Sequence, residues 1–313
     1  MKNLRVVYMG TPDFAVPCLE RLVSEGYQIA AVVTQPDRPK GRGRKLTPSP
    51  VKETALKHNL PVWQPEKVKT PEFVAQLEAL NPDVIIVVAF GQLLSPQILV
   101  IPEYGCINVH ASLLPKYRGA APIHWAVING ETETGVATMY MDAGLDTGDV
   151  ILERTVSIDP EETTGQLYER LRLIGADLLV QTLGKVATKT VTRTPQDNNR
   201  ATYAKLLTRD IEGINWRYSA QQIHNLIRGL NPWPGAYCEH SGKILKIWRS
   251  KVSRSSGSFG QCGQVLSISE TGCQIATSDG IIELLEVQPE SKKRMTAGEY
   301  VRGYGMNVGE ILG

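Results

Sequence analysis

Cysteine is scarce in this chain, and long apolar runs are absent from it. The 313 residues contain five cysteines, an odd number, and no CxxC pair, so neither a disulfide framework nor a zinc knuckle is predicted. No segment approaches the roughly 18 to 20 apolar residues of a membrane span, the longest candidate being residues 84–90, and residues 1–4 lead into a strand without a signal-peptide pattern. We therefore expect a cytoplasmic protein with reduced cysteines.

Several cofactor signatures are missing as well. Gly10 follows the first predicted strand, but the full GxGxxG pattern is absent, so a dinucleotide cofactor is not expected. Residues 41–43 read Gly-Arg-Gly without a following GK[ST], which excludes a P-loop. The histidines show no HExxH or similar spacing, so no metal is predicted.

The first half of the chain alternates strand-like and helix-like segments. Strands are predicted at residues 4–9, 29–34, 84–89, 106–109, 135–141 and 150–158, and helices at residues 11–24, 71–80, 120–129 and 164–185. The run at 84–89 is apolar throughout, which is typical of a buried parallel strand. This alternation predicts an α/β fold, a doubly wound and mostly parallel sheet of the Rossmann-like kind, over residues 1–188.

The second half has a different pattern. Residues 189–207 are polar and without periodicity, and we interpret them as a linker. Over residues 208–313 a helix is predicted at 219–228, followed by short strands at 236–239, 244–248, 263–268, 273–276 and 281–287. Five short strands separated by turn signals predict a small β-barrel of the OB type with a basic edge. A structural cap domain without a ligand is the alternative.

Positive charge is concentrated rather than abundant. The net charge is only +2, yet two groups of basic residues contain no acid: Arg38, Lys40, Arg42, Arg44 and Lys45, and then Lys243, Lys246, Arg249, Lys251 and Arg254. The first group lies in residues 34–50, where four prolines and two glycines predict an exposed, mobile loop. Basic residues on such a backbone suit the capture of phosphate. Solvated surface charge and a tolerated insertion are the alternatives.

Residues 106–119 hold the strongest candidate site. Asn108 and His110 are two positions apart, so on a strand their side chains project from one face. Asp146 offers a carboxylate that could orient the imidazole. The three groups can stabilise an oxyanion and move a proton without a protein nucleophile. Cys106 as a thiolate is disfavoured by its position on the strand, while a turn cap at Asn108, a core histidine at His110 and a turn-stabilising Asp146 remain alternatives.

These motifs together resemble the methionyl-tRNA formyltransferase family over nearly the whole chain. The most specific segments are GTPDFA at 10–15, TQPDRPKGRGRKLTPSPVK at 34–52, INVHASLLPKYRGAAPI at 107–123, MDAGLDTGD at 141–149 and NPWPGAY at 231–237. The SLLPKYRG segment is similar to the wider group of enzymes that use 10-formyltetrahydrofolate. The basic insertion and the C-terminal domain are typical of the tRNA-acting branch.

The resemblance implies a role for each matching residue. Asn108, His110 and Asp146 would be catalytic, and Ser112, Leu113, Leu114 and Pro115 would border the folate pocket. The donor would be 10-formyltetrahydrofolate, and the acceptor would be the α-amine of methionine on initiator tRNA, a reaction of translation initiation. We further expect Arg42, Arg44 and Lys45 to contact the tRNA, and the enzyme to be a monomer.

Two other functions remain open. A formyltransferase acting on a small amine, such as glycinamide ribonucleotide or an amino sugar nucleotide, would share the catalytic residues but would not need the basic loop. A noncatalytic RNA-binding protein would need the barrel but not Asn108, His110 and Asp146.

Overall fold

The structure is a computed structural model that describes residues 4–40 and 45–313. The chain divides into two compact units. Unit 1 comprises residues 1–119, 135–156 and 168–203, and unit 2 comprises residues 120–134, 157–167 and 204–313. The chain therefore passes from one unit to the other several times, and the long helix α6 (Thr164–Ala187) begins in unit 2 and continues in unit 1.

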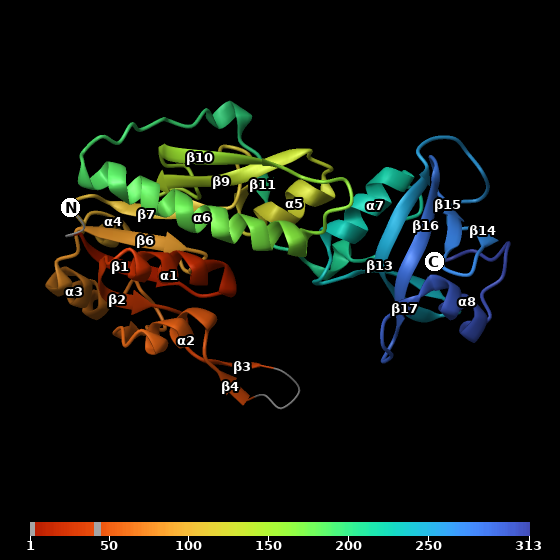
Figure 1. The fold of residues 1–313 in the computed structure, drawn as a ribbon, viewed down its shortest axis with the longest axis horizontal. Coiled ribbons are helices and arrows are strands. Elements are labelled where there is room, and N and C mark those ends of the chain that lie inside the picture. Colours follow the sequence, from red (N-terminus) through yellow and green to blue (C-terminus); the bar gives the residue numbers. More distant parts are fainter. Residues whose placement is uncertain (1–3, 41–44) are drawn as a thin grey trace. The chain divides into compact units, whose positions relative to one another are not determined.

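Unit 1 contains most of the helices and a large sheet (Figure 1). Its helices, besides α6, are α1 (Val16–Ser24), α2 (Pro50–Lys57), α3 (Pro71–Leu80) and α4 (Pro96–Leu99). The first strands are β1 (Arg5–Gly10), β2 (Gln28–Val33), β3 (Arg38–Lys40), β4 (Lys45–Thr47) and β5 (Val62–Trp63). They are followed by β6 (Val84–Val88), β7 (Cys106–His110), β8 (Arg118–Gly119), β9 (Glu133–Tyr140) and β10 (Val150–Ser157).

The large sheet has seven strands in the order β10-β9-β7-β6-β1-β2-β5. Strands β5, β2, β1, β6 and β7 run parallel to one another, and β9 runs antiparallel to β7. All five residues of β6 are buried, as a fully apolar parallel strand requires. The prediction of a mostly parallel α/β sheet is thus confirmed.

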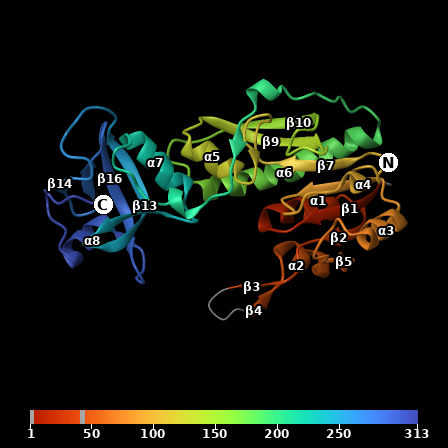
Figure 2. The same cartoon turned by 180° about the vertical axis from the view of Figure 1, so that it is seen from behind.

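The helices of unit 1 begin at side-chain caps, and the longest of them packs closely against the sheet. Ser49 and Thr70 cap the first turns of α2 and α3, and each is followed by a proline, whose missing N–H costs nothing there. Helix α6 runs along the sheet (Figures 1 and 2). It packs closely at Gly175, where an added Cβ would lie 3.1 Å from Val109 of β7 and 3.5 Å from Val136 of β9.

Unit 2 is built on an antiparallel sheet. Its helices are α5 (Pro122–Ile128), α7 (Ala220–Gly229) and α8 (Ala297–Tyr304). Its strands are β12 (Ala236–His240), β13 (Lys243–Arg254), β14 (Val265–Ile268), β15 (Cys273–Ala276), β16 (Ile281–Pro289) and β17 (Met295–Thr296). The strand order is β12-β13-β16-β15-β14, and β17 pairs with β16. The short strand β11 (Tyr203–Ala204) pairs with β8.

The core of unit 2 explains this arrangement. Ile223 and Ile227 of α7 pack with Leu245 and Ile247 of β13 and with Leu284 of β16, and all five are buried. An antiparallel sheet with one face against a helix needs this alternation of buried and exposed positions. The prediction of an α/β domain followed by an antiparallel β domain is therefore confirmed.

Two local predictions differ from the structure. The helix predicted at residues 11–24 begins at Val16, after a short 3-10 turn at Asp13–Ala15, and the Thr11 hydroxyl donates to the carbonyl of Phe90 at 2.9 Å instead of capping a helix. The predicted loop at 34–50 contains a short antiparallel hairpin, in which Arg38–Lys40 pairs with Lys45–Thr47. Proline is compatible with such a pair because each strand has a free edge. No helix within the described residues is long and apolar enough to cross a membrane.

Candidate active site

Strand β7 brings Asn108 and His110 to the same edge of the large sheet. Asn108 pairs in register with Val87 of β6 and Met139 of β9, and His110 is the last residue of the strand. Because β7 is parallel to β6, His110 lies at the carboxyl edge of the parallel strands, where open α/β sheets bind their ligands. Both side chains are buried, 9% and 6% exposed.

The two ring nitrogens of His110 have different surroundings. Nε2 lies 3.0 Å from the carbonyl oxygen of Tyr117. A carbonyl only accepts, so Nε2 carries a proton and donates it. Nδ1 lies 3.7 Å from Oδ2 of Asp146. That distance exceeds the roughly 2.7 to 3.2 Å of an N–H···O hydrogen bond. Nδ1 is therefore not bonded to Asp146 and can form a hydrogen bond with a ligand or a water.

Asp146 lies in the loop between β9 and β10 and has a left-handed backbone, with φ at +54°. Its Oδ2 accepts a hydrogen bond from the Gly119 N–H at 2.8 Å. The side chain of Asp146 is 15% exposed. A carboxylate that is fixed by a backbone donor and faces an imidazole can orient the ring and stabilise its positive charge.

The Asn108 amide differs from the other polar groups of the site. Within the part of the chain that the structure describes, its side chain has no hydrogen-bond partner. Its amide atoms are not among the fully buried N and O atoms that lack a partner, so the amide is open to water or to a ligand. Its two N–H donors therefore remain available to a bound molecule.

Arg118 and Gln196 support the Asp146 loop, and neither was among the predicted site residues. The Arg118 guanidinium is 2% exposed, and its Nε and Nη2 donate to Oε1 of Gln196 at 3.0 and 2.7 Å. Gln196 Nε2 then donates to the carbonyls of Asp146 at 2.9 Å and Gly148 at 2.7 Å. The arginine thus fixes the orientation of the amide that holds the loop.

The signal for this support in the amino-acid sequence is weak. Arg118 stands in the SLLPKYRG segment, but a buried arginine is rare and was not predicted. Gln196 lies in residues 189–207, which were interpreted as a linker. Asn198 in the same segment accepts a second bond from Arg118 Nη2, at 2.9 Å.

Cys106 is the one thiol on β7. It is 1% exposed, and burial raises the pKa of its thiol to about 12. Its Sγ points at the carbonyl of Ile98, 3.8 Å away. A thiol held in this way is protonated at neutral pH and cannot serve as a nucleophile.

The turn at 112–115 is partly inside the protein. The Ser112 hydroxyl is fully buried and donates to the carbonyl of Lys116 at 2.6 Å. Leu114 belongs to a small apolar cluster with Ala137, Met139 and Val150. Leu113 and Pro115 are half-buried. A ligand at this turn would therefore meet Leu113, Pro115 and the backbone rather than the Ser112 hydroxyl.

Of the three predicted tRNA contacts, only Lys45 falls within the described residues. Arg42 and Arg44 lie outside the described residues, and Lys45 is described only by its backbone, which pairs with Lys40 at the start of β4. On the flanking residues, Arg38 is ion-paired to Glu66 at 3.3 Å.

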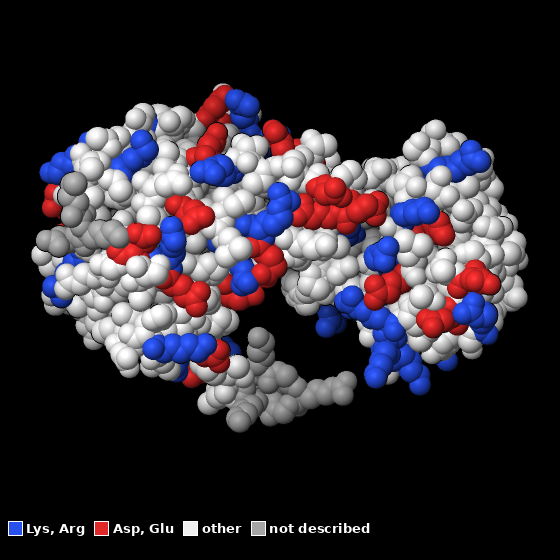
Figure 3. All heavy atoms as spheres, viewed as in Figure 1, with Lys and Arg blue, Asp and Glu red and all other residues white. Residues whose placement is uncertain are grey.

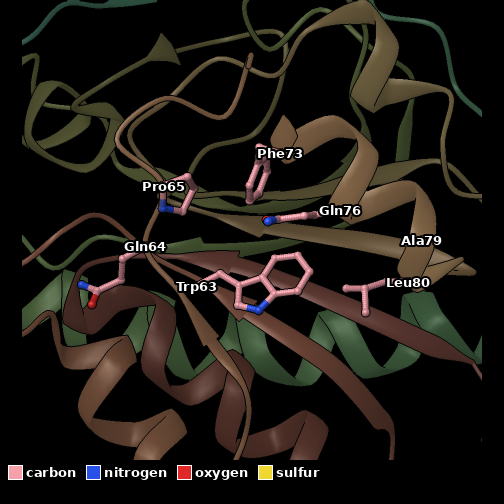
Figure 4. A pocket seen from close by; sticks show the side chains of 7 residues that line it. All are labelled: Trp63, Gln64, Pro65, Phe73, Gln76, Ala79 and Leu80. Atoms are coloured by element: carbon pink, nitrogen blue, oxygen red, sulfur yellow. The ribbon is translucent and has the colours of Figure 1, made fainter. Parts of the chain in front are cut away.

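A separate groove of about 570 Å³ lies in unit 1 between β5 and α3 (Figure 4). It is lined by Trp63, Gln64, Pro65, Phe73, Gln76, Ala79 and Leu80. The rings of Trp63 and Phe73 meet edge to face, with centroids 6.1 Å apart. None of the lining side chains titrates, so the groove has no group for acid–base chemistry.

Sequence comparisons agree over both units. The family described as formyl transferase matches residues 2–183, and the formyl transferase C-terminal domain matches residues 207–305. The methionyl-tRNA formyltransferase of Clostridioides difficile is 49% identical over 310 residues, covering 99% of this chain and 100% of the relative. That of Pelotomaculum thermopropionicum is 54% identical, covering 99% of each chain.

Solved structures share the fold at lower identity. An N-formyltransferase from Helicobacter canadensis, in complex with folinic acid and dTDP-3-aminofucose, is 21% identical with a TM-score of 0.66, covering 90% of this chain and 99% of that one. HypX from Aquifex aeolicus, in complex with tetrahydrofolic acid, is 14% identical with a TM-score of 0.65, covering 98% of this chain and 48% of that one. At these identities the likeness shows the fold alone.

Proposed function

This chain belongs to the methionyl-tRNA formyltransferase family, and we propose that it transfers the formyl group of 10-formyltetrahydrofolate to the α-amino group of methionine on initiator methionyl-tRNA. The observation that supports this proposal most is the arrangement of polar side chains at the end of β7. There the Nδ1 edge of His110 faces Asp146 at 3.7 Å. Asn108, two residues earlier on the same face of the strand, has an amide without a partner within the described residues.

The chemistry requires no covalent enzyme intermediate. A neutral α-amine is itself a nucleophile, so the protein has to hold it against the formyl carbon and remove its proton. The buried, protonated thiol of Cys106 supports direct attack by the amine, because it is the only thiol on β7.

Asn108 and His110 stabilise the charge that develops on the formyl oxygen. The Asn108 amide offers N–H donors that make no bond within the described part of the chain. It is held on a strand paired on both sides, so no reorganisation is needed during the reaction. His110, with Nε2–H fixed on the Tyr117 carbonyl, adds a second donor through Nδ1 when the ring carries both protons.

His110 and Asp146 also move the proton. The amine loses a proton as it attacks, and the folate nitrogen gains one as it leaves. The 3.7 Å between Nδ1 and Oδ2 leaves room for a substrate atom or a water at that edge. Asp146 keeps the ring oriented, and the Gly119 N–H and Gln196 keep Asp146 in place.

The formyl donor is a substrate that the turn 112–115 would border. It supplies an activated one-carbon group. The half-buried side chains of Leu113 and Pro115 suit the faces of a planar heterocycle, whereas the Ser112 hydroxyl is bound to Lys116. We therefore assign the donor contacts of this turn to Leu113, Pro115 and the backbone of Ser112 and Leu114.

Recognition of the tRNA is assigned to the basic residues Arg42, Arg44 and Lys45 and to a C-terminal tRNA-binding domain at 208–313. Replacing all three by Ala is expected to weaken binding of charged initiator tRNA and to reduce the salt dependence of that binding, because phosphate contacts release counterions. Donor binding, measured in the same preparation, should not change. Unchanged tRNA affinity at low salt would contradict the assignment.

The deciding experiment is radiolabelled formyl transfer from 10-formyltetrahydrofolate to charged initiator tRNA. Uncharged tRNA, free methionine and glycinamide ribonucleotide serve as competing acceptors. If the proposed function is right, only the charged tRNA should receive the formyl group. We further propose that the enzyme is a cytoplasmic monomer. Transfer to the small amine instead would favour the small-amine function, and binding of tRNA without any transfer would favour a noncatalytic role.

A further inference from the structure

The carbonyl that binds His110 belongs to a residue with an unfavourable backbone conformation. Tyr117, whose carbonyl oxygen accepts the hydrogen bond from His110 Nε2, has a left-handed backbone with φ at +58°. In residues other than glycine this conformation is costly, because Cβ comes too close to the following carbonyl oxygen. The conformation of Tyr117 therefore depends on contacts from other parts of the chain.

Thr202 supplies such contacts. Its Oγ1 accepts a hydrogen bond from the Tyr117 N–H at 2.8 Å, and its carbonyl accepts one from the Arg118 N–H at 2.9 Å. The Thr202 N–H in turn donates to the Pro115 carbonyl at 3.3 Å. A single residue, 85 positions after Tyr117, thus holds residues 115–118 by both its backbone and its side chain.

The peptide group between Tyr117 and Arg118 connects Thr202 with His110. In a trans peptide the C=O and the N–H lie in one plane and point in opposite directions. The N–H of this group donates to the Thr202 carbonyl, and the C=O accepts from His110 Nε2 at 3.0 Å. Fixing one end of the peptide group therefore fixes the direction of the other end.

The Arg118 side chain restrains the same peptide group from the inside of the protein. Charged side chains are spread over the face of the molecule that Figure 3 shows, but Arg118 is only 2% exposed, and its guanidinium is bonded to Gln196 and Asn198. Thr202, by contrast, is exposed. Its hydroxyl can therefore be removed without disturbing a buried charge or a core side chain.

We propose that Thr202 is a positioning residue for His110: its hydroxyl holds the Tyr117 backbone, so that the Tyr117 carbonyl keeps the neutral ring in the Nε2–H form. In that form Nδ1 carries no proton and can accept the one that the attacking amine loses. If the carbonyl turned away, the ring proton would also occupy Nδ1, and the ring would then lack a base on the side of Asp146. The inference deepens the proposed function and rests on it, since His110 is taken as the group that moves the proton.

The tautomer can be measured without any substrate, in a long-range proton–nitrogen correlation spectrum of the full chain with labelled histidine. The spectrum is recorded at a pH where the ring is neutral, and the His110 signal is identified by its loss in His110→Asn. The unaltered chain should show the Nε2–H form. Thr202→Val keeps the branched side chain but removes the hydroxyl, and it should raise the ratio of Nδ1–H to Nε2–H about three- to tenfold, to a detectable population, as expected for one lost hydrogen bond.

Two further variants at Thr202 separate the hydroxyl from the shape of the side chain. Thr202→Ser keeps the hydroxyl and should retain the tautomer of the unaltered chain. Thr202→Ala lacks the hydroxyl and should behave like Thr202→Val. The matched control is Thr188→Val, because Thr188 is also exposed and its hydroxyl donates to the Gly184 carbonyl at 3.0 Å, within unit 1. This control should change neither the tautomer nor the turnover.

The kinetic consequence is measured in formyl transfer. Thr202→Val should lower kcat by about the factor by which one hydrogen bond changes an equilibrium, three- to tenfold, with little change in the KM of the donor, and Thr202→Ser should restore kcat. An unchanged tautomer in Thr202→Val and Thr202→Ala, or an equal change in Thr202→Ser, would overturn the proposal. Because the spectrum requires no formyl transfer, absence of transfer in the unaltered chain would count against the proposed function and not against the effect of Thr202 on the ring.

Discussion

Two buried histidines, His110 in unit 1 and His224 in unit 2, have nearly the same surroundings but different capacity for chemistry. Both are at most 6% exposed, and the Nε2 of each lies near a backbone carbonyl, at 3.0 Å from Tyr117 and 3.2 Å from Pro160. Each also has a carboxylate nearby, Asp146 at 3.7 Å and Glu161 at 3.6 Å. Burial and an acidic neighbour therefore do not distinguish them.

The difference lies in the second ring nitrogen. His224 Nδ1 is hydrogen-bonded to the Ser250 hydroxyl at 3.1 Å, and Glu161 approaches the nitrogen that already faces Pro160. Both nitrogens of His224 are thus used by the fold. In His110, Nδ1 has no hydrogen bond among residues 4–40 and 45–313, and Asp146 lies beyond hydrogen-bond distance from it. We propose that unused hydrogen-bonding capacity, rather than burial, distinguishes a functional histidine from a structural one.

The presence of a pocket does not identify the catalytic histidine either. A pocket of about 260 Å³ lies beside His224 and is lined by Pro160, Glu161, Gln221, His224, Arg249, Lys251, Val252 and Leu285. Two of its lining side chains already have partners: Glu161 lies 3.6 Å from His224 Nε2, and Lys251 is ion-paired to Glu283 at 3.4 Å. The surroundings of His224 therefore favour a structural role for it. The substitutions described next test the difference between the two sites.

Among the changes at Asn108, Gln196 and His224, the largest effect is expected at Asn108. Asn108→Ala removes an oxyanion donor, so turnover in formyl transfer should fall by about a hundredfold to a thousandfold. Asn225→Ala is the matched control, because Asn225 is buried too but accepts a bond from Arg228 Nε at 2.9 Å. That variant should lose stability and keep its turnover. Near-normal turnover of Asn108→Ala would remove its assigned role.

A smaller effect is expected at Gln196. Gln196→Glu keeps an acceptor for Arg118 but replaces the amide that donates to the Asp146 and Gly148 carbonyls. Losing two hydrogen bonds of about 1 kcal/mol each should lower kcat by about ten- to thirtyfold, with little change in the KM of the donor. A purely structural role would instead lower the yield of folded enzyme at unchanged kcat.

The smallest effect is a pH dependence of stability at His224. Burial lowers the pKa of His224 from its ordinary value of 6.5, with Arg228 acting in the same direction and Glu161 opposing. Below about pH 6.5 the unfolded chain takes up a proton that the folded chain refuses, so stability present above this pH is lost as pH falls. His224→Gln should therefore flatten the decline of the urea midpoint between pH 7 and 5.5. An equally steep decline in that variant would contradict the shift.

Much of the fold followed from the sequence because it depends on local patterns. The apolar run at β6 and the two-residue spacing of Asn108 and His110 are readable from one segment each. Helices α2 and α8 were not predicted, although Ser49 before a proline and the Thr296–Glu299 capping box were visible signals. Both helices are short and lie among irregular segments.

Other features depend on contacts between distant segments. The pairing of Arg118 with Gln196 spans 78 positions, and polar residues in an aperiodic segment give no sign of what they will contact. The left-handed backbone of Asp146 likewise depends on the loop closing around it. A sequence pattern names the chemical groups of the site, whereas the support that positions them comes only from the folded chain.

The most direct test of the account is the single-turnover rate of formyl transfer in His110→Asn and His224→Asn, measured side by side at matched concentrations of folded enzyme. His110→Asn should slow the step by about a hundredfold to ten-thousandfold, as expected for loss of a general acid–base group. The rate of His224→Asn should stay within about twofold of the unaltered chain, because His224 is assigned a structural role. Similar losses in both variants, or a normal rate in His110→Asn, would contradict the claim that unused hydrogen-bonding capacity marks the active site.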